Sequence, residues 1–177
     1  NKKLFEKSKS LRNLCFGKKD RFNHEDIGWN YRMTNLQASL GVSQLKRIKS
    51  IVHKRHLVGK EYFQRLKYNK NIYIPETSRN YAKNIYWVIA FVITNKNLNI
   101  DAKKMMKKLI TYGIQTRPFF WPMHKQKIFK EKYKINTSGN YKNSEYISKY
   151  GLYLPSSLDI KSNQIKFICD KVNSILK

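Results

Sequence analysis

A polar turn that leads straight into a long helix with an apolar stripe constrains this fold more than any other feature of the sequence. The turn covers residues 28–33, and Thr34 follows it. Thr34 and Gln37 have the spacing of a capping box, in which each side chain bonds a backbone N–H that the first helical turn leaves free. We therefore predict a helix that begins after Thr34, preceded by an elbow that holds Asn30 and Arg32.

The position of Asn30 and Arg32 allows two interpretations. Free amides and the helix dipole favour an anion such as a phosphate at a helix N-terminus, which makes the elbow a candidate phosphate site. The alternative is an ordinary cap that follows a glycine turn and binds no ligand. The local pattern by itself favours the ordinary cap.

The pattern of the remaining chain predicts an α/β domain. Residues 34–66 carry apolar side chains at mostly helical intervals, so we expect one long helix there, kinked or weakened near Gly41 and Gly59. Residues 85–94 are β-branched and aromatic, which predicts a buried central strand. Further expected elements are a helix over 2–14, a polar loop through Asp26, an extended piece at 72–74, a helix that Asp101 caps and Gly113 ends, a strand over 114–117, an irregular, partly helical stretch over 121–142, a helix over 143–150, a strand over 152–154 and a last helix capped by Ser162 or Asn163.

The charge of the chain raises the question of a polyanionic partner. With 37 Lys and Arg against 11 Asp and Glu, the 177 residues carry a formal net charge of +26, which attracts nucleic acid at low salt. A basic binding module for nucleic acid is therefore one alternative function. The basic residues stand mostly singly or in pairs, and no block of five or six occurs, so we expect no specific nucleic-acid partner.

Neither a membrane segment nor a metal site is expected. The longest apolar stretch, 85–93, is too short to cross a bilayer as a helix, and two scattered cysteines fit a reducing, cytoplasmic location. His53 and His56 could face one side of a helix, but no third ligand lies nearby, so we expect surface histidines. Cys169 belongs to the apolar stripe of the last helix and is expected in the core.

Three separated segments resemble those of one enzyme family. They are Gly28–Gly41 followed by Gln44-Leu45, then residues 113–120, then Gly151–Ser156. In this order they are similar to the DegT/DnrJ/StrS family of nucleotide-sugar aminotransferases, in particular to its perosamine-synthase-like members. The resemblance implies the C-terminal part of a fold type I transferase that depends on pyridoxal 5'-phosphate (PLP). Residues 1–33 would be a remnant of the large PLP-binding domain, 34–66 the connecting helix and 67–177 the small α/β domain.

The resemblance also implies a reaction, and it implies which parts of the catalytic machinery this chain holds. The full-length enzyme would move an amino group, from glutamate, to a 4-keto-6-deoxy nucleotide sugar for surface polysaccharide such as lipopolysaccharide, as a homodimer with shared active sites. The Schiff-base lysine of the family lies in a glycine-rich turn upstream of a helix like residues 2–14. The sequence holds neither that turn nor the acidic partner of the PLP ring, so we expect no catalytic residue here and no activity from this chain alone. A third hypothesis is a scaffold half that a separately encoded partner completes.

Two residues of the elbow take cofactor roles from the resemblance. Asn30 matches the asparagine that reaches the PLP phosphate of the other subunit, and Arg32 lies beside it. His24 would sit at the mouth of the same shared site and contact substrate. The alternative for His24 is a solvent-exposed loop histidine.

Four residues of the later segment take substrate roles from the resemblance. Arg117, Phe119, Phe120 and His124 match the segment that approaches the active site from the small domain. An arginine can pair with a diphosphate, and aromatic rings can stack on a base or sugar. The alternative is that Phe119 and Phe120 fill the core, in a loop that Pro118 and Pro122 stiffen. The chain departs from the family pattern at Cys15 and at residues 127–129, which leaves the details of the substrate side open.

Overall fold

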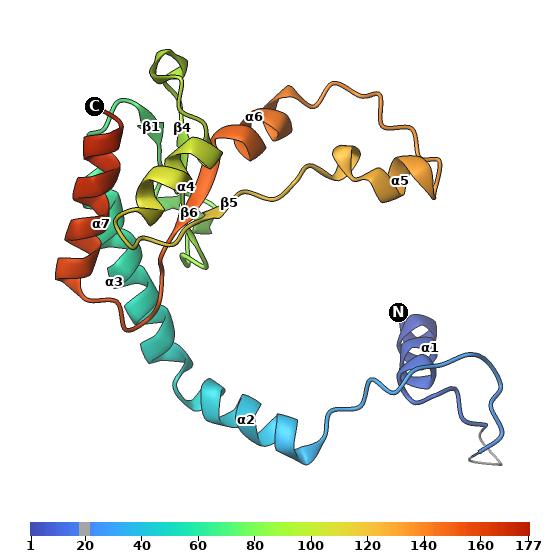
Figure 1. Ribbon diagram of the computed structural model, residues 1–177. Coiled ribbons are helices and arrows are strands. Elements are labelled where there is room, and N and C mark those ends of the chain that lie inside the picture. The colour runs from blue at the N-terminus through green and yellow to red at the C-terminus, as the bar shows by residue number, and fades with distance from the viewer. Residues whose placement is uncertain (18–21) are drawn as a thin grey trace. The chain divides into compact units, whose positions relative to one another are not determined.

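The computed structural model describes residues 1–17 and 22–177, which form two units, Asn1–Ile48 and Lys49–Lys177 (Figure 1). Part of the polar loop predicted ahead of the elbow, residues 18–21, lies outside the described residues.

Among its described residues, the first unit contains two helices, with the elbow just ahead of the second. α1 spans Lys2–Arg12 and is capped by Asn1, whose side chain accepts hydrogen bonds from two amides of the first turn. The helix was predicted over residues 2–14, but Leu14 and Cys15 have φ values of 64° and 51°. An α-helix needs φ near −60° at every residue, so the helix ends before them.

Two helices replace the single one predicted over 34–66. α2 spans Asn35–Lys46 and α3 spans Ile48–Leu66. The break falls at Arg47, with ψ near 4°, and its amide bonds two carbonyls in the last turn of α2. α2 therefore ends in a tightened last turn. Gly41 and Gly59, which were expected to weaken the helix, lie within regular helix.

The second unit contains a four-stranded antiparallel sheet in the order β1-β4-β6-β5. β4, Ile89–Ile93, and β6, Gly151–Leu154, form its centre, while β1, Ile72–Tyr73, and β5, Arg117–Pro118, are its short edges. This mixture of sheet and helices confirms the predicted α/β class (Figure 1). The other elements are the hairpin β2, Ser78–Arg79, with β3, Ala82–Lys83; the helices α4, Ala102–Ile110, α5, Lys127–Glu131, α6, Lys142–Tyr150, and α7, Ser162–Ile175; and the 3-10 turns η1, Lys96–Leu98, and η2, Met123–Lys125.

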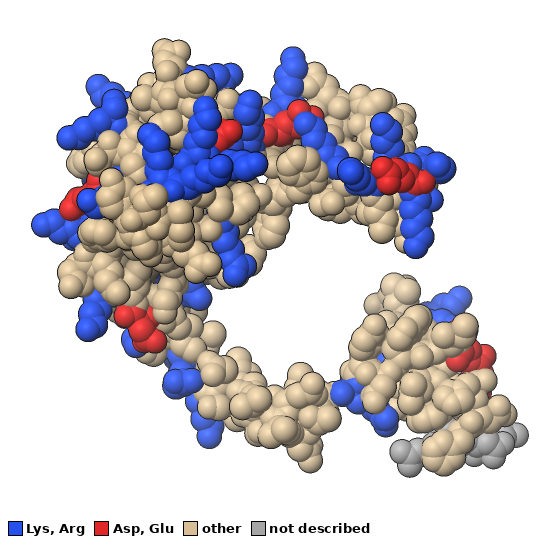
Figure 2. Space-filling view, viewed as in Figure 1, with Lys and Arg blue, Asp and Glu red and all other residues tan. Residues whose placement is uncertain are grey.

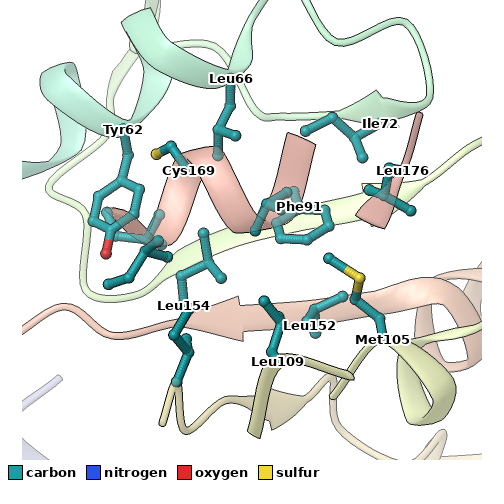
Figure 3. Packing of buried hydrophobic residues seen from close by; sticks show 14 of the residues in the cluster. Tyr62, Leu66, Ile72, Phe91, Met105, Leu109, Leu152, Leu154, Cys169 and Leu176 are labelled. Atoms are coloured by element: carbon teal, nitrogen blue, oxygen red, sulfur yellow. The ribbon is translucent and has the colours of Figure 1, made fainter. Parts of the chain in front are cut away.

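Alternate residues of the two central strands point into one hydrophobic core. Phe91 is the cross-strand partner of Leu152, Ile89 is the partner of Leu154, and all four side chains are buried. Burial of such side chains is the main favourable term in folding. Figure 3 shows the helical side chains that pack with them, among them Tyr62 and Leu66 from α3, Met105 and Leu109 from α4, and Cys169 from α7.

The strand predicted over residues 85–94 is shorter than expected. Only Ile89–Ile93 has strand pairing. Ahead of it Tyr86 has a φ of 53°, and Ile85 and Trp87 are exposed. A left-handed residue cannot continue an extended strand, so the apolar side chains on either side of Tyr86 reach the surface instead of the core.

The strand predicted over residues 114–117 is also shorter, because its first residues close α4. The Ile114 amide donates to the Leu109 carbonyl, and the Gly113 amide donates to the Ile110 carbonyl. These two bonds form a Schellman motif, in which Gly113 has a φ of 72°. Gly113 therefore ends the helix as predicted, and the strand itself is only β5.

The N-caps of the two later helices were predicted with mixed success. Asp101 caps α4 as expected and accepts the amide three residues further along. At α7 the cap is Lys161, whose amide donates to Gln164 Oε1 over 2.9 Å, and not Ser162 or Asn163. The cap residue thus lies one position earlier, and Gln164 satisfies its amide from within the first turn.

Cys169 is confirmed as a core residue. Its side chain is buried on the inner face of α7, and burial raises the pKa of the thiol to about 12. Such a thiol stays protonated and unreactive at neutral pH.

Within the described residues, no helix combines the length and apolarity needed to cross a membrane. The same residues hold no cluster of three or more His, Cys, Asp and Glu side chains that could bind a metal ion. His53 is exposed, and His56 is half-buried with its ring edge-on to that of Tyr86.

Candidate functional site

The elbow that carries Asn30 lies against the end of α1. The N–H groups of Trp29 and Tyr31 donate to carbonyls in the last turn of α1, over 2.8 and 3.0 Å. Gly28 permits this approach, because a Cβ at that position would lie 2.6 Å from the Cys15 amide nitrogen. The backbone on both sides of Asn30 is therefore fixed before any ligand binds.

Asn30 and Arg32 form a pair of adjacent hydrogen-bond donors on this elbow. Arg32 Nε donates to Asn30 Oδ1 over 3.0 Å, and both residues are exposed. Since the Asn30 oxygen accepts from Arg32, its NH₂ group and the other guanidinium N–H groups are what the pair can offer to a ligand. Amide and guanidinium donors side by side suit an oxyanion such as a phosphate.

The capping box predicted at the start of α2 is confirmed. The Gln37 amide donates to Thr34 Oγ1 over 3.2 Å, and the Thr34 amide donates to Gln37 Oε1 over 2.9 Å. One of the amides that could attract an anion is thus already bonded. The side chains of the elbow therefore matter more for anion binding than the start of the helix itself.

His24 is engaged with the turn that follows α1. Its Nδ1 lies 2.6 Å from the Leu14 carbonyl oxygen, so Nδ1 carries a proton and donates it there. Its ring lies 5.0 Å from that of Phe16, centroid to centroid, and the residue is exposed. His24 therefore holds the turn together, and Nε2 is the ring nitrogen it can offer to a substrate.

The second group of predicted residues lies in the second unit, around β5. Arg117 is the cross-strand partner of Tyr153, which places both side chains on one face of the sheet. That face is opposite the core, because Tyr153 alternates with the buried Leu152. The ring of Phe119 lies over Gly151, where any Cβ would clash with it, and meets Tyr153 edge-on at 4.8 Å.

Phe120 is a surface residue and not part of the core. It is 70% exposed, and its ring lies nearly parallel to that of Trp87, with 6.4 Å between centroids and 17° between planes. It also meets Tyr153 edge-on at 6.1 Å. The interpretation of Phe120 as core filling is therefore wrong, whereas Phe119 is half-buried.

His124 is fastened to α6. Its Nε2 lies 3.0 Å from Glu145 Oε1, and its ring stacks on Tyr141 at 4.3 Å. Lys125 Nζ lies 2.9 Å from the second oxygen of the carboxylate. The hydrogen bonds from Lys125 and His124 lower the pKa of Glu145, so this carboxylate is charged at neutral pH. His124 joins η2 to α6, and a substrate role for it stays a prediction.

The structure brings three of the predicted residues together with two that the sequence reasoning missed. Trp87, Phe119, Phe120 and Tyr153 are linked by ring contacts and form what we call the aromatic cluster. Arg117 is on the sheet face that holds Tyr153. Asn30, Arg32 and His24 belong to the first unit, where a hydrogen bond joins Asn30 to Arg32 and His24 bonds the Leu14 carbonyl instead.

Two signals could have revealed the missed aromatic residues. Asn84 accepts the Tyr86 amide through its side chain over 2.8 Å, an Asx turn that an asparagine ahead of an apolar run can indicate. Such a turn predicts a surface position for Trp87. Alternation along a short strand would have placed Tyr153 opposite its buried neighbours.

The fold matches part of the fold of solved PLP-dependent enzymes, aminotransferases among them. The structure matches that of *Helicobacter pylori* PseC, an aminotransferase involved in the biosynthesis of pseudoaminic acid, with a TM-score of 0.85 at 21% identity, over 99% of this chain and 47% of that one. It also matches an *E. coli* GDP-4-keto-6-deoxy-D-mannose-3-dehydratase with bound hydrated PLP, with a TM-score of 0.76 at 16% identity, over 100% of this chain and 48% of that one.

The sequence defines the family within that fold. Residues 1–173 match the model of the DegT/DnrJ/EryC1/StrS aminotransferase family, and the chain belongs to this family, whose aminotransferases use PLP. GDP-perosamine synthase of *Vibrio cholerae* is 27% identical over 174 residues, 97% of this chain and 45% of that protein. The enzyme of the same name from *Escherichia coli* O157:H7 is 25% identical over 150 residues, 85% of this chain and 38% of that protein. The chain thus spans about half the length of the relatives it matches or less.

Proposed function

We propose that this chain supplies the C-terminal, substrate-facing part of a PLP-dependent nucleotide-sugar aminotransferase. The whole enzyme transfers an amino group from glutamate to a 4-keto-6-deoxy nucleotide sugar for surface polysaccharide, and acts in the cytoplasm as a homodimer with shared sites. The observation that carries the proposal is the family match over residues 1–173. The names of the relatives, GDP-perosamine synthases among them, support the substrate class.

The donor pair of the elbow fits the phosphate of PLP. Asn30 adds an uncharged N–H donor and Arg32 adds a cation, and the hydrogen bond between them sets both in place before the ligand arrives. When bound, PLP acts as the electron sink for amino transfer. The role of this chain toward it is to hold the phosphate.

The second unit fits the nucleotide-sugar side of the reaction. Arg117 is exposed on the outer face of the sheet, where its guanidinium can pair with the diphosphate. The aromatic cluster on the same face offers flat apolar surface beside that charge. Orientation of a charged substrate by such groups lowers the entropy cost of reaching the reactive geometry.

The distribution of charge supports an enzyme over a dedicated nucleic-acid binder. Figure 2 shows Lys and Arg side chains scattered over the visible face of each unit, among few acidic groups. A scattered charge favours weak, salt-sensitive attraction to polyanions. Binding to mixed-sequence DNA that persists above physiological ionic strength would favour the nucleic-acid alternative instead.

The test is amino transfer by this chain together with the polypeptide encoded next to it, in the same frame or in a neighbouring gene. We expect ¹⁵N from labelled glutamate to enter a GDP- or UDP-linked 4-keto-6-deoxy sugar, as read by mass spectrometry. The chain alone should show no transfer. If activity appears only with a separately encoded partner, this chain is the scaffold half of a two-chain enzyme.

A matched pair of variants tests the elbow in that assay. Asn30→Ala should weaken PLP binding by roughly tenfold or more, because a hydrogen bond to a charged group contributes about 1.5–3 kcal/mol. Asn140→Ala removes an exposed asparagine of the second unit and should leave PLP binding unchanged. Equal PLP affinity in both variants would show that Asn30 does not bind PLP. Absence of transfer with every sugar and donor would contradict the proposed function.

A further inference from the structure

The segment that carries Trp87 is held in a fixed, unusual conformation. Arg55 of α3 donates through Nη1 to the Trp87 carbonyl over 3.3 Å and to the Ser156 carbonyl over 3.0 Å. Just before it, Tyr86 has a left-handed φ, and its ring packs against Gly59. Left-handed conformations of bulky residues persist only where the surroundings fix them, and they concentrate at binding sites.

This fixed backbone presents an aromatic side chain to solvent. Trp87 is 65% exposed, although it follows the buried Tyr86 and precedes the central strand. Among the described residues its ring contact is with Phe120, itself 70% exposed, which lies nearly parallel to it. Two large apolar rings that are held parallel and left open to solvent form a flat surface on which a third planar ring can stack.

The charge of Arg117 on β5 restricts which kind of ligand ring would bind to this surface. Tyr153 supports Phe120 edge-on from the outer face of the sheet, and Arg117 is the cross-strand partner of Tyr153 on that face. A flat aromatic surface near a guanidinium matches a planar heterocycle attached to an anion. A nucleoside diphosphate combines those two features, because its base stacks and its diphosphate pairs with arginine.

We propose that Trp87 and Phe120 form the stacking surface for the base of a nucleoside diphosphate, which makes Trp87 a substrate-binding residue. The proposal rests on the proposed function for its choice of a nucleotide sugar as ligand. Trp87 supplies the face of the stack, Phe120 supports it, and Arg55 is a positioning residue that acts through the Trp87 carbonyl.

The test is binding of GDP, UDP and pyrophosphate to the full 177-residue chain, followed by tryptophan fluorescence and calorimetry. GDP and UDP should quench the fluorescence of the unaltered chain. Trp87→Leu should weaken GDP binding by about 5- to 140-fold, as expected for one base stacked on an aromatic ring, and leave pyrophosphate binding unchanged. Trp87→Phe keeps a planar ring and should recover most of the GDP affinity.

Trp121→Leu is the matched control. Trp121 is 60% exposed on the same segment as Phe120, but its indole N–H donates to the Lys125 carbonyl and its ring has no contact within the aromatic cluster. This variant should bind GDP within twofold of the unaltered chain. Circular dichroism should show both leucine variants folded, as expected for changes at exposed positions.

Three results would overturn the proposal: no GDP binding to the chain, equal losses in Trp87→Leu and Trp121→Leu, or a loss in Trp87→Leu that pyrophosphate shares. The transfer assay keeps this failure apart from that of the proposed function. If Trp87→Leu catalyses transfer with an unchanged KM for the nucleotide sugar, the stacking proposal is wrong and the proposed enzyme function stands. If GDP binds in a base-dependent way but no transfer occurs, the proposed enzyme function is wrong and the stacking proposal stands.

Discussion

Gly28 shows how the presentation of a binding residue can depend on the absence of one side chain. Alanine at this position would place its Cβ 2.6 Å from the backbone of Leu14 and Cys15. Neither backbone atom can move without opening the turn, so Gly28→Ala should destabilise the elbow by about 1–3 kcal/mol, the usual cost of overpacking. Cys15, which is 1% exposed, should then react with iodoacetamide roughly 5 to 140 times faster.

The chain offers two controls for this measurement. Gly41→Ala changes a glycine within α2 that has nothing within 4 Å of the added Cβ, so Cys15 should stay protected there. Cys169 should remain unmodified in every variant, because it is buried in the second unit and burial raises the pKa of its thiol. Equal alkylation of Cys15 in both glycine variants would show that the elbow does not need Gly28.

Tyr62 makes the stability of the second unit depend on pH in the alkaline range. Burial is the first cause that raises the pKa of Tyr62 above its usual value near 10, and its hydroxyl donates to the Pro155 carbonyl over 2.8 Å. Above pH 10 the unfolded chain releases this proton while the folded chain keeps it. The contribution of Tyr62 is therefore complete below pH 10 and falls as the pH rises further, by up to about 1.4 kcal/mol per pH unit.

A phenylalanine at position 62 isolates this effect. Tyr62→Phe loses a hydrogen bond and should be less stable by about 1 kcal/mol at pH 7, but the difference from the unaltered chain should shrink between pH 10 and 11. Urea unfolding at each pH measures it. Tyr68→Phe changes a tyrosine that is 79% exposed and should give a pH-independent difference near zero. If the difference in free energy of unfolding between Tyr62→Phe and the unaltered chain stays constant with pH, Tyr62 is not the cause of the alkaline pH dependence.

Elements whose signals are local were predictable from the sequence, and those that depend on distant contacts were not. The capping box of Thr34 and the cap at Asp101 each need only residues three positions apart, and both are confirmed. The bend at Tyr86 depends on Arg55, which is 31 residues away and bonds its carbonyl. No periodicity within residues 85–94 contains that contact, so the exposure of Trp87 was missed.

The same locality limits what could be predicted of the candidate site. Asn30 and Arg32 are two residues apart, and the sequence placed them together correctly on one elbow. His124 is bonded to Glu145, 21 residues further along, which no local pattern shows. Its engagement with α6 came only from the structure.

The N-cap of α4 allows a direct measurement of how much one local sequence signal contributes to the free energy of unfolding. Asp101 Oδ1 accepts the Lys104 amide over 2.8 Å, and the helix that follows buries Met105 and Leu109 in the core. Asp101→Ala should lower the free energy of unfolding by about 1 kcal/mol, because an N-cap amide loses its acceptor. Asp101→Asn keeps an acceptor of the same shape and should cost only a few tenths of that. Urea unfolding followed by circular dichroism measures both, and equal losses would show that the cap contributes through its charge alone.

Across the whole molecule, burial is concentrated in the second unit. Cys15 is the one buried residue among those described in the first unit, whereas the core cluster belongs entirely to residues 62–176. In α2 the apolar residues Leu36, Leu40 and Leu45 are 64–74% exposed. Since a helix of this length is marginal in water without a packed face, most of the stability of the chain must come from the second unit.

This distribution predicts a divided pattern of hydrogen exchange in the chain alone. Amides of α2 should exchange within minutes, since local unfolding there costs little, while those of β4 and α7 should exchange only with global unfolding. α7 is the matched control, because it is a helix of similar length that buries Ile165, Ile168 and Val172. Addition of a polypeptide that completes the enzyme should slow exchange in α2 and leave α7 unchanged, because only α2 gains a packed face. Equal protection of α2 and α7 at every concentration of the chain alone would show that the first unit is stable without such a partner.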